Sequence, residues 1–125
     1  MMITLPMKKF LQRESVFILN NNTKYLNKMV KHIVAFKLTG TDEERREVAL
    51  KFKEALLALP EQIEVLRSME VGINENPNET WDVVLTAVVD TMADVEVYAK
   101  HPAHVAAASL LAGHKGDRAC VDYEF

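Results

Sequence analysis

The sequence predicts an α+β domain with four strands and two helical regions in the order β-α-β-β-α-β. Three observations indicate this class. Residues 30–38 and 81–89 are rich in β-branched and apolar side chains, as in covered strands. Thr41 and Thr91 each precede an apolar pattern with helical spacing, and residues 118–125 alternate as a terminal strand. A chain of 125 residues with 49% hydrophobic side chains suffices for one domain with a sizeable core.

The first 28 residues differ in composition from the rest of the chain. They carry five Lys and Arg against one Glu, a charge of +4, so residues 29–125 carry −7 of a net charge of −3. We predict an N-terminal extension over residues 1–28 and one domain over residues 29–125. The extension is either the result of an upstream start before Met29 or a genuine arm on the domain. Such an arm would pack Phe10, Val16, Phe17, Ile18 and Leu19. A signal peptide is not expected, because the one candidate apolar run is interrupted by Gln12, Arg13 and Glu14.

The first strand and the first helix have clear local signals. One face of residues 30–38 carries His32, Val34, Phe36 and Leu38. The other face is also apolar, so we expect both to be covered. Thr41 with Glu44 three residues later forms a capping box that opens a helix, and Pro60 is expected to end this helix.

Two further strands are predicted after this helix. One spans about residues 65–73 and the next spans residues 81–89, both with alternating or apolar patterns. The segment between them, residues 74–80, holds three Asn, one Pro and two Glu, which is typical of a turn region.

Two short helices are predicted before the last strand. Thr91 opens the first, and Pro102 ends it, because a residue before proline is disfavoured in a helix. Proline suits the first position of a helix, so a separate helix is expected from Pro102 to about Leu111, with His101 as its cap. This second helix is expected to be closed by Gly113 and Gly116.

This order of elements is the split β-α-β arrangement of ferredoxin-like domains. It predicts a four-stranded antiparallel sheet whose helices cover one face. Since the strands are apolar on both sides, the other face needs a partner, and a second copy of the chain is the simplest one. We therefore expect a homodimer formed through the sheet face.

Composition excludes several functional classes. Cys120 is the single cysteine, which rules out an intramolecular disulfide and favours a reducing, cytoplasmic location. The acidic domain lacks the basic face that a nucleic-acid partner requires. No apolar run approaches the roughly 20 residues of a membrane span, and the four scattered glycines form no phosphate-binding loop.

Three segments of the domain carry a family resemblance. They are Met29-Val30-Lys31-His32-Ile33-Val34, Tyr98-Ala99-Lys100-His101-Pro102-Ala103-His104 and Arg118-Ala119-Cys120-Val121-Asp122-Tyr123. In these segments the chain resembles the stress-responsive dimeric α/β-barrel (Dabb) family. The resemblance implies a ferredoxin-like protomer whose sheets form a barrel across a dimer. The family ranges from stress-associated plant proteins to a polyketide cyclase.

The resemblance to that cyclase also implies site residues. There, a Tyr and the last His of the same run act on the substrate, the His as base; these positions match Tyr98 and His104. The first-strand His matches His32. Another pocket His of the cyclase falls on Asp82, where this sequence departs from the pattern. The expected ligand pocket is completed by Asp82, His101, Val34 and Phe36, and no cofactor is implied.

Elementary chemistry gives these residues both a functional and a structural interpretation. The positive end of a helix disfavours imidazolium, so His104 is expected to be neutral and able to accept a proton. The Tyr98 hydroxyl could then hold a carbonyl or enolate oxygen, and His32 could polarise the same ligand. Alternatively, Tyr98 and His32 are core residues with satisfied polar atoms, and His104 bonds local amides. His101 is expected to act mainly as a cap.

A metal site is not expected from the spacing of the ligands. His101 and His104 are three residues apart but lie across a helix boundary, and His32 with Asp82 is the other pairing considered. Cys120 has apolar neighbours and is predicted to be a buried, inert thiol.

Two functions remain open. The first is a small dimer that binds an apolar, carbonyl-bearing small molecule, with cofactor-free proton-transfer chemistry of the cyclase, lyase or isomerase type. The second is a non-catalytic, stress-associated structural dimer.

Overall fold

The computed structural model describes residues 28–125, which contain seven strands and α-helices. They are β1 (Val30–Leu38), α2 (Asp42–Leu57), β2 (Ser68–Ile73), β3 (Val83–Val89), α3 (Met92–Lys100), α4 (Pro102–Ala108) and β4 (Lys115–Glu124). Short 3₁₀ turns follow α2 and α4, at Leu59–Glu61 and Ser109–Leu111. The predicted order of elements is confirmed. The proposed extension falls outside the described residues except for Lys28, so its nature stays a prediction.

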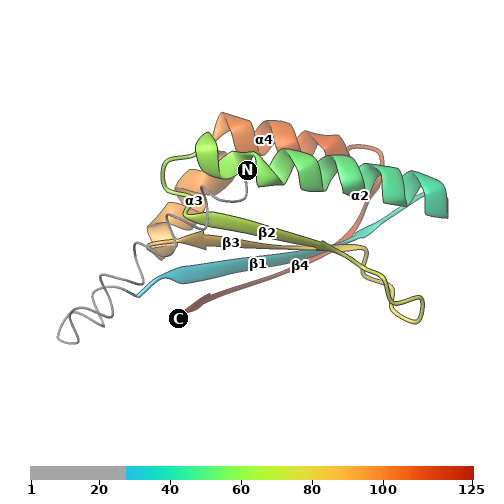
Figure 1. Cartoon of the computed structure of the whole chain (residues 1–125), viewed down its shortest axis with the longest axis horizontal. Coiled ribbons are helices and arrows are strands. Elements are labelled where there is room, and N and C mark those ends of the chain that lie inside the picture. Colours follow the sequence, from blue (N-terminus) through green and yellow to red (C-terminus); the bar gives the residue numbers. More distant parts are fainter. Residues whose placement is uncertain (1–27) are drawn as a thin grey trace.

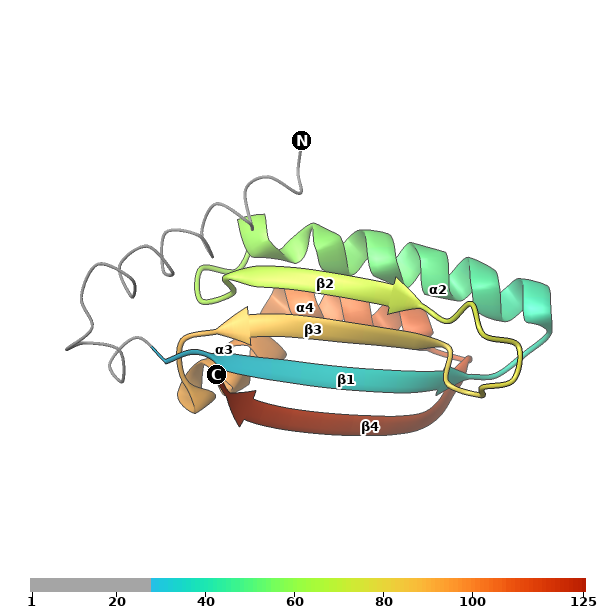
Figure 2. The ribbon, with the colours of Figure 1, turned by 60° about the horizontal axis from the view of Figure 1, so that its bottom comes forward.

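The four strands form one antiparallel sheet in the order β2-β3-β1-β4. The central strand β1 pairs Val34 with Leu85 on β3 and with Cys120 on β4. Figures 1 and 2 show α2, α3 and α4 together on one side of the sheet, with β4 at its edge. This is the predicted ferredoxin-like fold. Within residues 28–125, no helix is long and apolar enough to cross a membrane.

The core lies between the sheet and the helices. Alternate residues of β1 point into it, and Val30, Val34 and Leu38 are buried there. Helix α2 contributes Ala49, Phe52 and Leu56. The remaining buried apolar side chains come mainly from β2, β3 and the turns beside the helices, and include Leu59, Ile63, Leu66, Met69, Val71, Leu85, Ala87 and Leu111.

The start of α2 is fixed by the predicted capping box. The Glu44 backbone N–H donates to the Thr41 hydroxyl at 3.1 Å, and the Thr41 N–H donates to the Glu44 carboxylate at 2.8 Å. The hydrogen bond from the Thr41 backbone lowers the pKa of Glu44. Two helix N–H groups that would otherwise lack partners are thereby satisfied.

Several boundaries differ from the sequence prediction. Helix α2 ends at Leu57 and not at Pro60, because the chain tightens into a 3₁₀ turn that contains this proline. Strand β2 begins only at Ser68, since the Leu66 N–H donates to the Ile63 carbonyl at 3.1 Å and makes a turn there.

Gly116 does not close a helix as predicted but lies inside β4. A Cβ atom at this position would stand 2.6 Å from the Lys37 carbonyl oxygen, so the two strands approach too closely for any other residue. The pairing of β1 and β4 shifts register between Phe36 and Leu38, next to this contact. Gly113, in contrast, has a φ of +83° and does occupy the turn before β4.

Among residues 28–125, nothing covers the sheet face opposite the helices (Figure 2). Cross-strand register places Ile33 beside Thr86 and Val121, and Ala35 beside Val84 and Ala119 on this face. Val84 and Val121 are 41% and 60% exposed. The prediction that both faces are apolar is therefore confirmed, whereas the protomer itself covers only one.

Removal of the capping hydroxyl tests the local basis of α2. We expect Thr41→Ala to lower the free energy of unfolding by about 1 kcal/mol, because the Glu44 N–H loses its acceptor. Urea denaturation at one fixed protein concentration measures the change. Thr80→Ala, at an exposed site between β2 and β3, is the control and should change stability by less than about 0.5 kcal/mol. Equal losses in both variants would contradict the role of the cap.

Candidate functional site

The joint between α3 and α4 brings two predicted residues together. His101 has φ −64° and ψ 136°, an extended backbone that interrupts the two helices directly before Pro102. Its Nδ1 atom accepts a hydrogen bond from the Ala103 N–H at 3.0 Å, so His101 is the N-cap of α4, as predicted. The turn places the Tyr98 and His104 rings against each other, with centroids 4.5 Å apart.

His104 is held in one tautomer. Its Nδ1 atom lies 2.9 Å from the Ala99 carbonyl oxygen, which only accepts, so Nδ1 carries the hydrogen and Nε2 keeps a free lone pair. Burial lowers the pKa of His104, against the opposing effect of the Ala99 carbonyl, and the charges of His32 and Arg118 lower it further. The side chain is thus a neutral imidazole near neutral pH.

Tyr98 occupies the middle of the cluster and is only 1% exposed. Its hydroxyl is buried and has no hydrogen-bond partner among residues 28–125. Burial raises the pKa of Tyr98, so the phenol stays protonated and can donate. The ring also meets that of His32 edge to face, with centroids 5.7 Å apart.

His32 is fixed from the opposite side by the last strand. It lies on the helix-facing side of β1, is 7% exposed and pairs across the sheet with Asp122. Its Nδ1 atom lies 2.5 Å from the Asp122 carboxylate, which accepts the hydrogen. A carboxylate of this kind orients an imidazole and fixes its tautomer. Asp122, His32, Tyr98 and His104 therefore form one continuous row.

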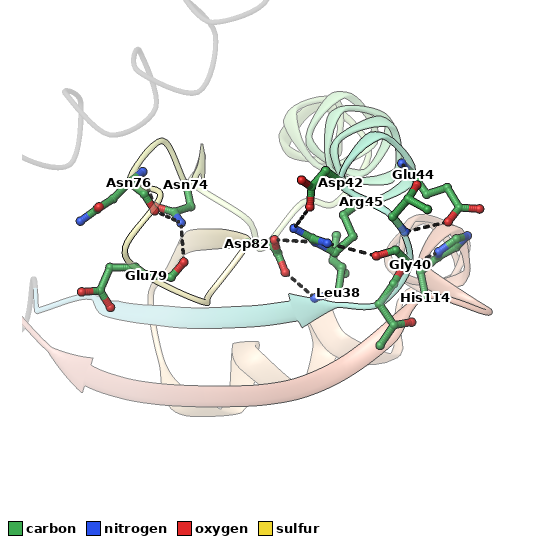
Figure 3. Close-up of polar contacts among 12 residues, drawn as sticks. Leu38, Gly40, Asp42, Glu44, Arg45, Asn74, Asn76, Glu79, Asp82 and His114 are labelled. Carbon is green, nitrogen blue, oxygen red and sulfur yellow. Dashed lines mark hydrogen bonds and ion pairs between the residues drawn. The ribbon is translucent and has the colours of Figure 1, made fainter.

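The structure does not bring Asp82 to this row. Its carboxylate accepts the Leu38 N–H at 2.6 Å and lies 3.3 Å from Arg45 Nε, at the start of α2 (Figure 3). Leu38 and His32 are at opposite ends of β1, about 20 Å apart along the strand. Asp82 here secures the junction of β1, β3 and α2.

The two predicted apolar pocket residues share the helix-facing side of β1 with His32. Val34 is buried and belongs to the core. Phe36 is partly buried and packs edge to face on Phe52 of α2, with centroids 5.6 Å apart. Both side chains are therefore placed to form an apolar surface of the candidate pocket. Phe36, however, lies nearer to the end of β1 at which Asp82 accepts the Leu38 N–H.

Sequence reasoning missed three residues of β4 as members of the site. Arg118, Cys120 and Asp122 alternate along this strand and lie opposite Phe36, Val34 and His32. Cys120 was predicted to be buried but is exposed, because the helices do not cover the edge strand. Partial burial of its sulfur, together with the Asp122 charge, raises the pKa of the Cys120 thiol. The signals for Asp122 were its alternation with apolar residues and its place in the Arg118–Tyr123 segment that carries the family resemblance.

Potential metal ligands meet at this edge in a combination that the sequence did not suggest. His32, Cys120 and Asp122 offer one ligand atom each, and these atoms lie within 4.8 Å of one another. The two pairings considered from spacing are not supported. The His101 ring nitrogen caps α4, and Asp82 is remote from His32.

The environment of His104 gives a prediction for its titration. Because its pKa is lowered by burial, His104 should titrate below the ordinary value of about 6.5. The unfolded chain then binds more protons as the pH falls through this range, so the free energy of unfolding should decrease below about pH 6.5. Proton NMR measures the titration, and His104→Gln identifies the resonance by its loss. A pKa above the ordinary value would contradict this environment.

Comparisons with known proteins agree with the fold. One crystal structure from Bacteroides fragilis is described as a dimeric protein of unknown function with a ferredoxin-like fold. It is 55% identical in sequence to this chain and has a TM-score of 0.76. The match covers 78% of this chain and 96% of the Bacteroides fragilis chain. An uncharacterized protein of Streptomyces coelicolor is 37% identical over 86 residues, 66% of this chain and 86% of that protein. The hydroxynitrile lyase of Passiflora edulis is 12% identical with a TM-score of 0.58, over 78% of this chain and 93% of its own, which shows the shared fold alone.

The family itself is established by a match along almost the whole described part. Residues 30–125 match the model of the stress responsive A/B barrel domain, from the first residue of β1 to the end of the chain. The matched range includes His32, Tyr98, His104 and Asp122. The chain therefore belongs to the stress responsive A/B barrel domain (Dabb) family.

Proposed function

We propose that this chain forms a homodimer that binds an apolar, carbonyl-bearing small molecule beside His32, Tyr98 and His104, and catalyses a cofactor-free proton transfer on it. The observation that carries the proposal is the buried hydroxyl of Tyr98, which has no hydrogen-bond partner within the described part of the chain. A buried hydroxyl without a partner costs about 1–3 kcal/mol. A ligand oxygen that accepts this hydrogen would remove the cost, which gives the site a preference for carbonyl groups.

The arrangement of donors and acceptors supports proton abstraction beside a carbonyl. His104 Nε2 takes a proton from the carbon next to the carbonyl, and the electron pair moves onto the carbonyl oxygen. The Tyr98 O–H donates to the resulting enolate oxygen. Return of the proton to carbon gives exchange or isomerisation, whereas attack of the enolate carbon on a second carbonyl of the same ligand closes a ring.

We assign to His32 the role of positioning the ligand, because its Nδ1 hydrogen bonds to Asp122 and its ring packs edge to face against Tyr98. The lowered pKa of His104, in contrast, keeps a free base available near neutral pH. This division of roles assigns the proton transfer to His104 and the oxygen contact to Tyr98.

Tyr98→Phe separates a ligand contact from a structural role. Since the hydroxyl has no partner among residues 28–125, we expect the variant to unfold at the same or higher urea concentration than the unmodified chain. It should nevertheless lose the small molecules that mass spectrometry identifies on the purified protein. A loss of stability with unchanged bound molecules would indicate a structural tyrosine and favour the non-catalytic dimer.

Deuterium exchange tests the chemical step. We expect the full chain to accelerate incorporation of deuterium from D₂O into pentane-2,4-dione, followed by NMR, and His104→Gln to lower the acceleration about 100- to 10,000-fold. His114→Gln is a matched control, because His114 Nδ1 also lies 3.0 Å from a backbone carbonyl, that of Thr39, away from the cluster. Equal rates in the two variants would argue against His104 as the base.

The dimer is proposed through the uncovered sheet face. The 55% identical Bacteroides fragilis protein is described as dimeric, and the face in this chain exposes Val84, Val121 and Tyr123. Exposed apolar side chains gathered on one sheet are typical of an interface between copies. A two-fold axis would place each of these side chains in the interface twice.

A charge on this face should separate the protomers. We expect Val121→Lys to give a monomer by light scattering at micromolar concentration, because two lysines would be buried in a two-fold interface. Leu50→Lys, at an exposed apolar position on the outer side of α2, should leave the dimer intact. A monomer in both variants, or a dimer in both, would contradict the proposed face.

A further inference from the structure

The helix-facing side of the β1–β4 edge gathers three different kinds of metal ligand. His32 Nδ1 reaches this edge from β1, and Cys120 and Asp122 are two residues apart on β4, so their side chains share that face. The helices do not cover β4, and Cys120 and Asp122 are both exposed there. An ion from solvent therefore reaches the site through Cys120 and Asp122, whereas His32 itself is only 7% exposed.

The distances between these atoms suit a tetrahedral ion. Cys120 Sγ lies 3.6 Å from His32 Nδ1 and 3.8 Å and 4.0 Å from the two Asp122 oxygens. Zinc bonds of about 2.3 Å to sulfur and about 2.1 Å to nitrogen, at a tetrahedral angle, separate these two ligands by about 3.6 Å. The sulfur and the imidazole thus already stand at the spacing of a shared metal ion.

The carboxylate is the ligand that has to move. Asp122 Oδ1 is hydrogen-bonded to His32 Nδ1 at 2.5 Å, whereas nitrogen and oxygen on one tetrahedral zinc ion lie about 3.4 Å apart. Asp122 is on the edge strand with its side chain 24% exposed, and the carboxylate would rotate away from His32 when the ion binds. The ion would take the place of the hydrogen between the two residues.

We propose that His32, Cys120 and Asp122 form a zinc site with water in the fourth position. A thiolate and an imidazole select Zn²⁺ over Mg²⁺ and Ca²⁺, which prefer oxygen ligands alone. On binding, the Cys120 thiol releases one proton to solvent, and the His32 proton moves from Nδ1 to Nε2. The two anionic ligands then balance the charge of the ion, and the complex is neutral.

This site is distinct from the proposed catalytic pair, although it shares a wall with it. Tyr98 and His104 provide no ligand atom, and His32 would bind the ion through the nitrogen that faces away from the proposed proton transfer, toward β4. Loss of one function therefore does not require loss of the other. His104→Gln should slow proton transfer about 100- to 10,000-fold while leaving metal binding unchanged.

Cobalt binding by the full chain tests the proposal. We expect Co²⁺ to give a thiolate-to-cobalt charge-transfer band and intense visible bands typical of four ligands, to saturate at one ion per protomer, and to be displaced by Zn²⁺. Cys120 is the single cysteine, so Cys120→Ser should abolish the charge-transfer band. His32→Gln and Asp122→Asn should each weaken binding at least about 10-fold, and His114→Gln should not.

The outcomes distinguish a metal site formed by all three side chains from metal binding by the Cys120 thiol alone. No charge-transfer band at millimolar Co²⁺ would overturn the proposal. The same band with unchanged affinity in Asp122→Asn and His32→Gln would overturn it too, because the metal would then bind Cys120 alone. Circular dichroism verifies the fold of each variant; if the buried His32→Gln does not fold, the exposed Asp122 and Cys120 variants suffice. Residues 1–27 contain no His or Cys and add neither ligand type.

Discussion

The placement of β1 between β3 and β4 is the constraint on which the rest of the molecule depends. This strand supplies core residues such as Val34, the buried His32 and the apolar patch around Ile33, on alternating sides. Its pairing with β4 sets Asp122 opposite His32, and its pairing with β3 anchors the Asp82 junction at the other end. Core, candidate site and open face are thus all fixed by one backbone register.

The second determinant is the break between α3 and α4. A continuous helix would keep Tyr98 and His104 on different sides, since six residues correspond to about 1.7 turns. The extended backbone at His101 and the proline after it redirect the chain, so that the two rings meet above β1. The energetic cost of ending a helix is offset locally by the His101 side chain, which accepts the Ala103 N–H.

Sequence reasoning succeeded where the signal was local. The Thr41–Glu44 capping box and the break at Pro102 each depend on residues that are close in the sequence. Helices α2 and α4 begin where these signals predict. It failed where the cause lay in another strand. A glycine is required at position 116 by the nearby Lys37 carbonyl. Asp122 belongs to the candidate site only because it bonds to His32, which is 90 residues away in the sequence. Such contacts depend on register, which no local pattern specifies.

Burial was also hard to predict at the edge of the sheet. Cys120 has the apolar neighbours of a core residue, and yet it is exposed because the helices lie over the other strands and leave β4 open at the sheet edge (Figure 2). The same edge leaves Asp122 exposed beside the buried His32. The residue types were visible in the sequence, whereas the exposure of Cys120 and Asp122 follows from how far the helical layer extends.

Strand β4 also limits which insertions and deletions the sequence can tolerate. Its even-numbered residues Arg118, Cys120 and Asp122 face the helix side, and its odd-numbered residues Ala119, Val121 and Tyr123 face the open side. Deletion or insertion of a single codon before this run would exchange the two sets at once, putting carboxylate and guanidinium groups on the apolar surface and aliphatic groups beside His32. Point changes can be absorbed one face at a time, but length changes in this strand cannot.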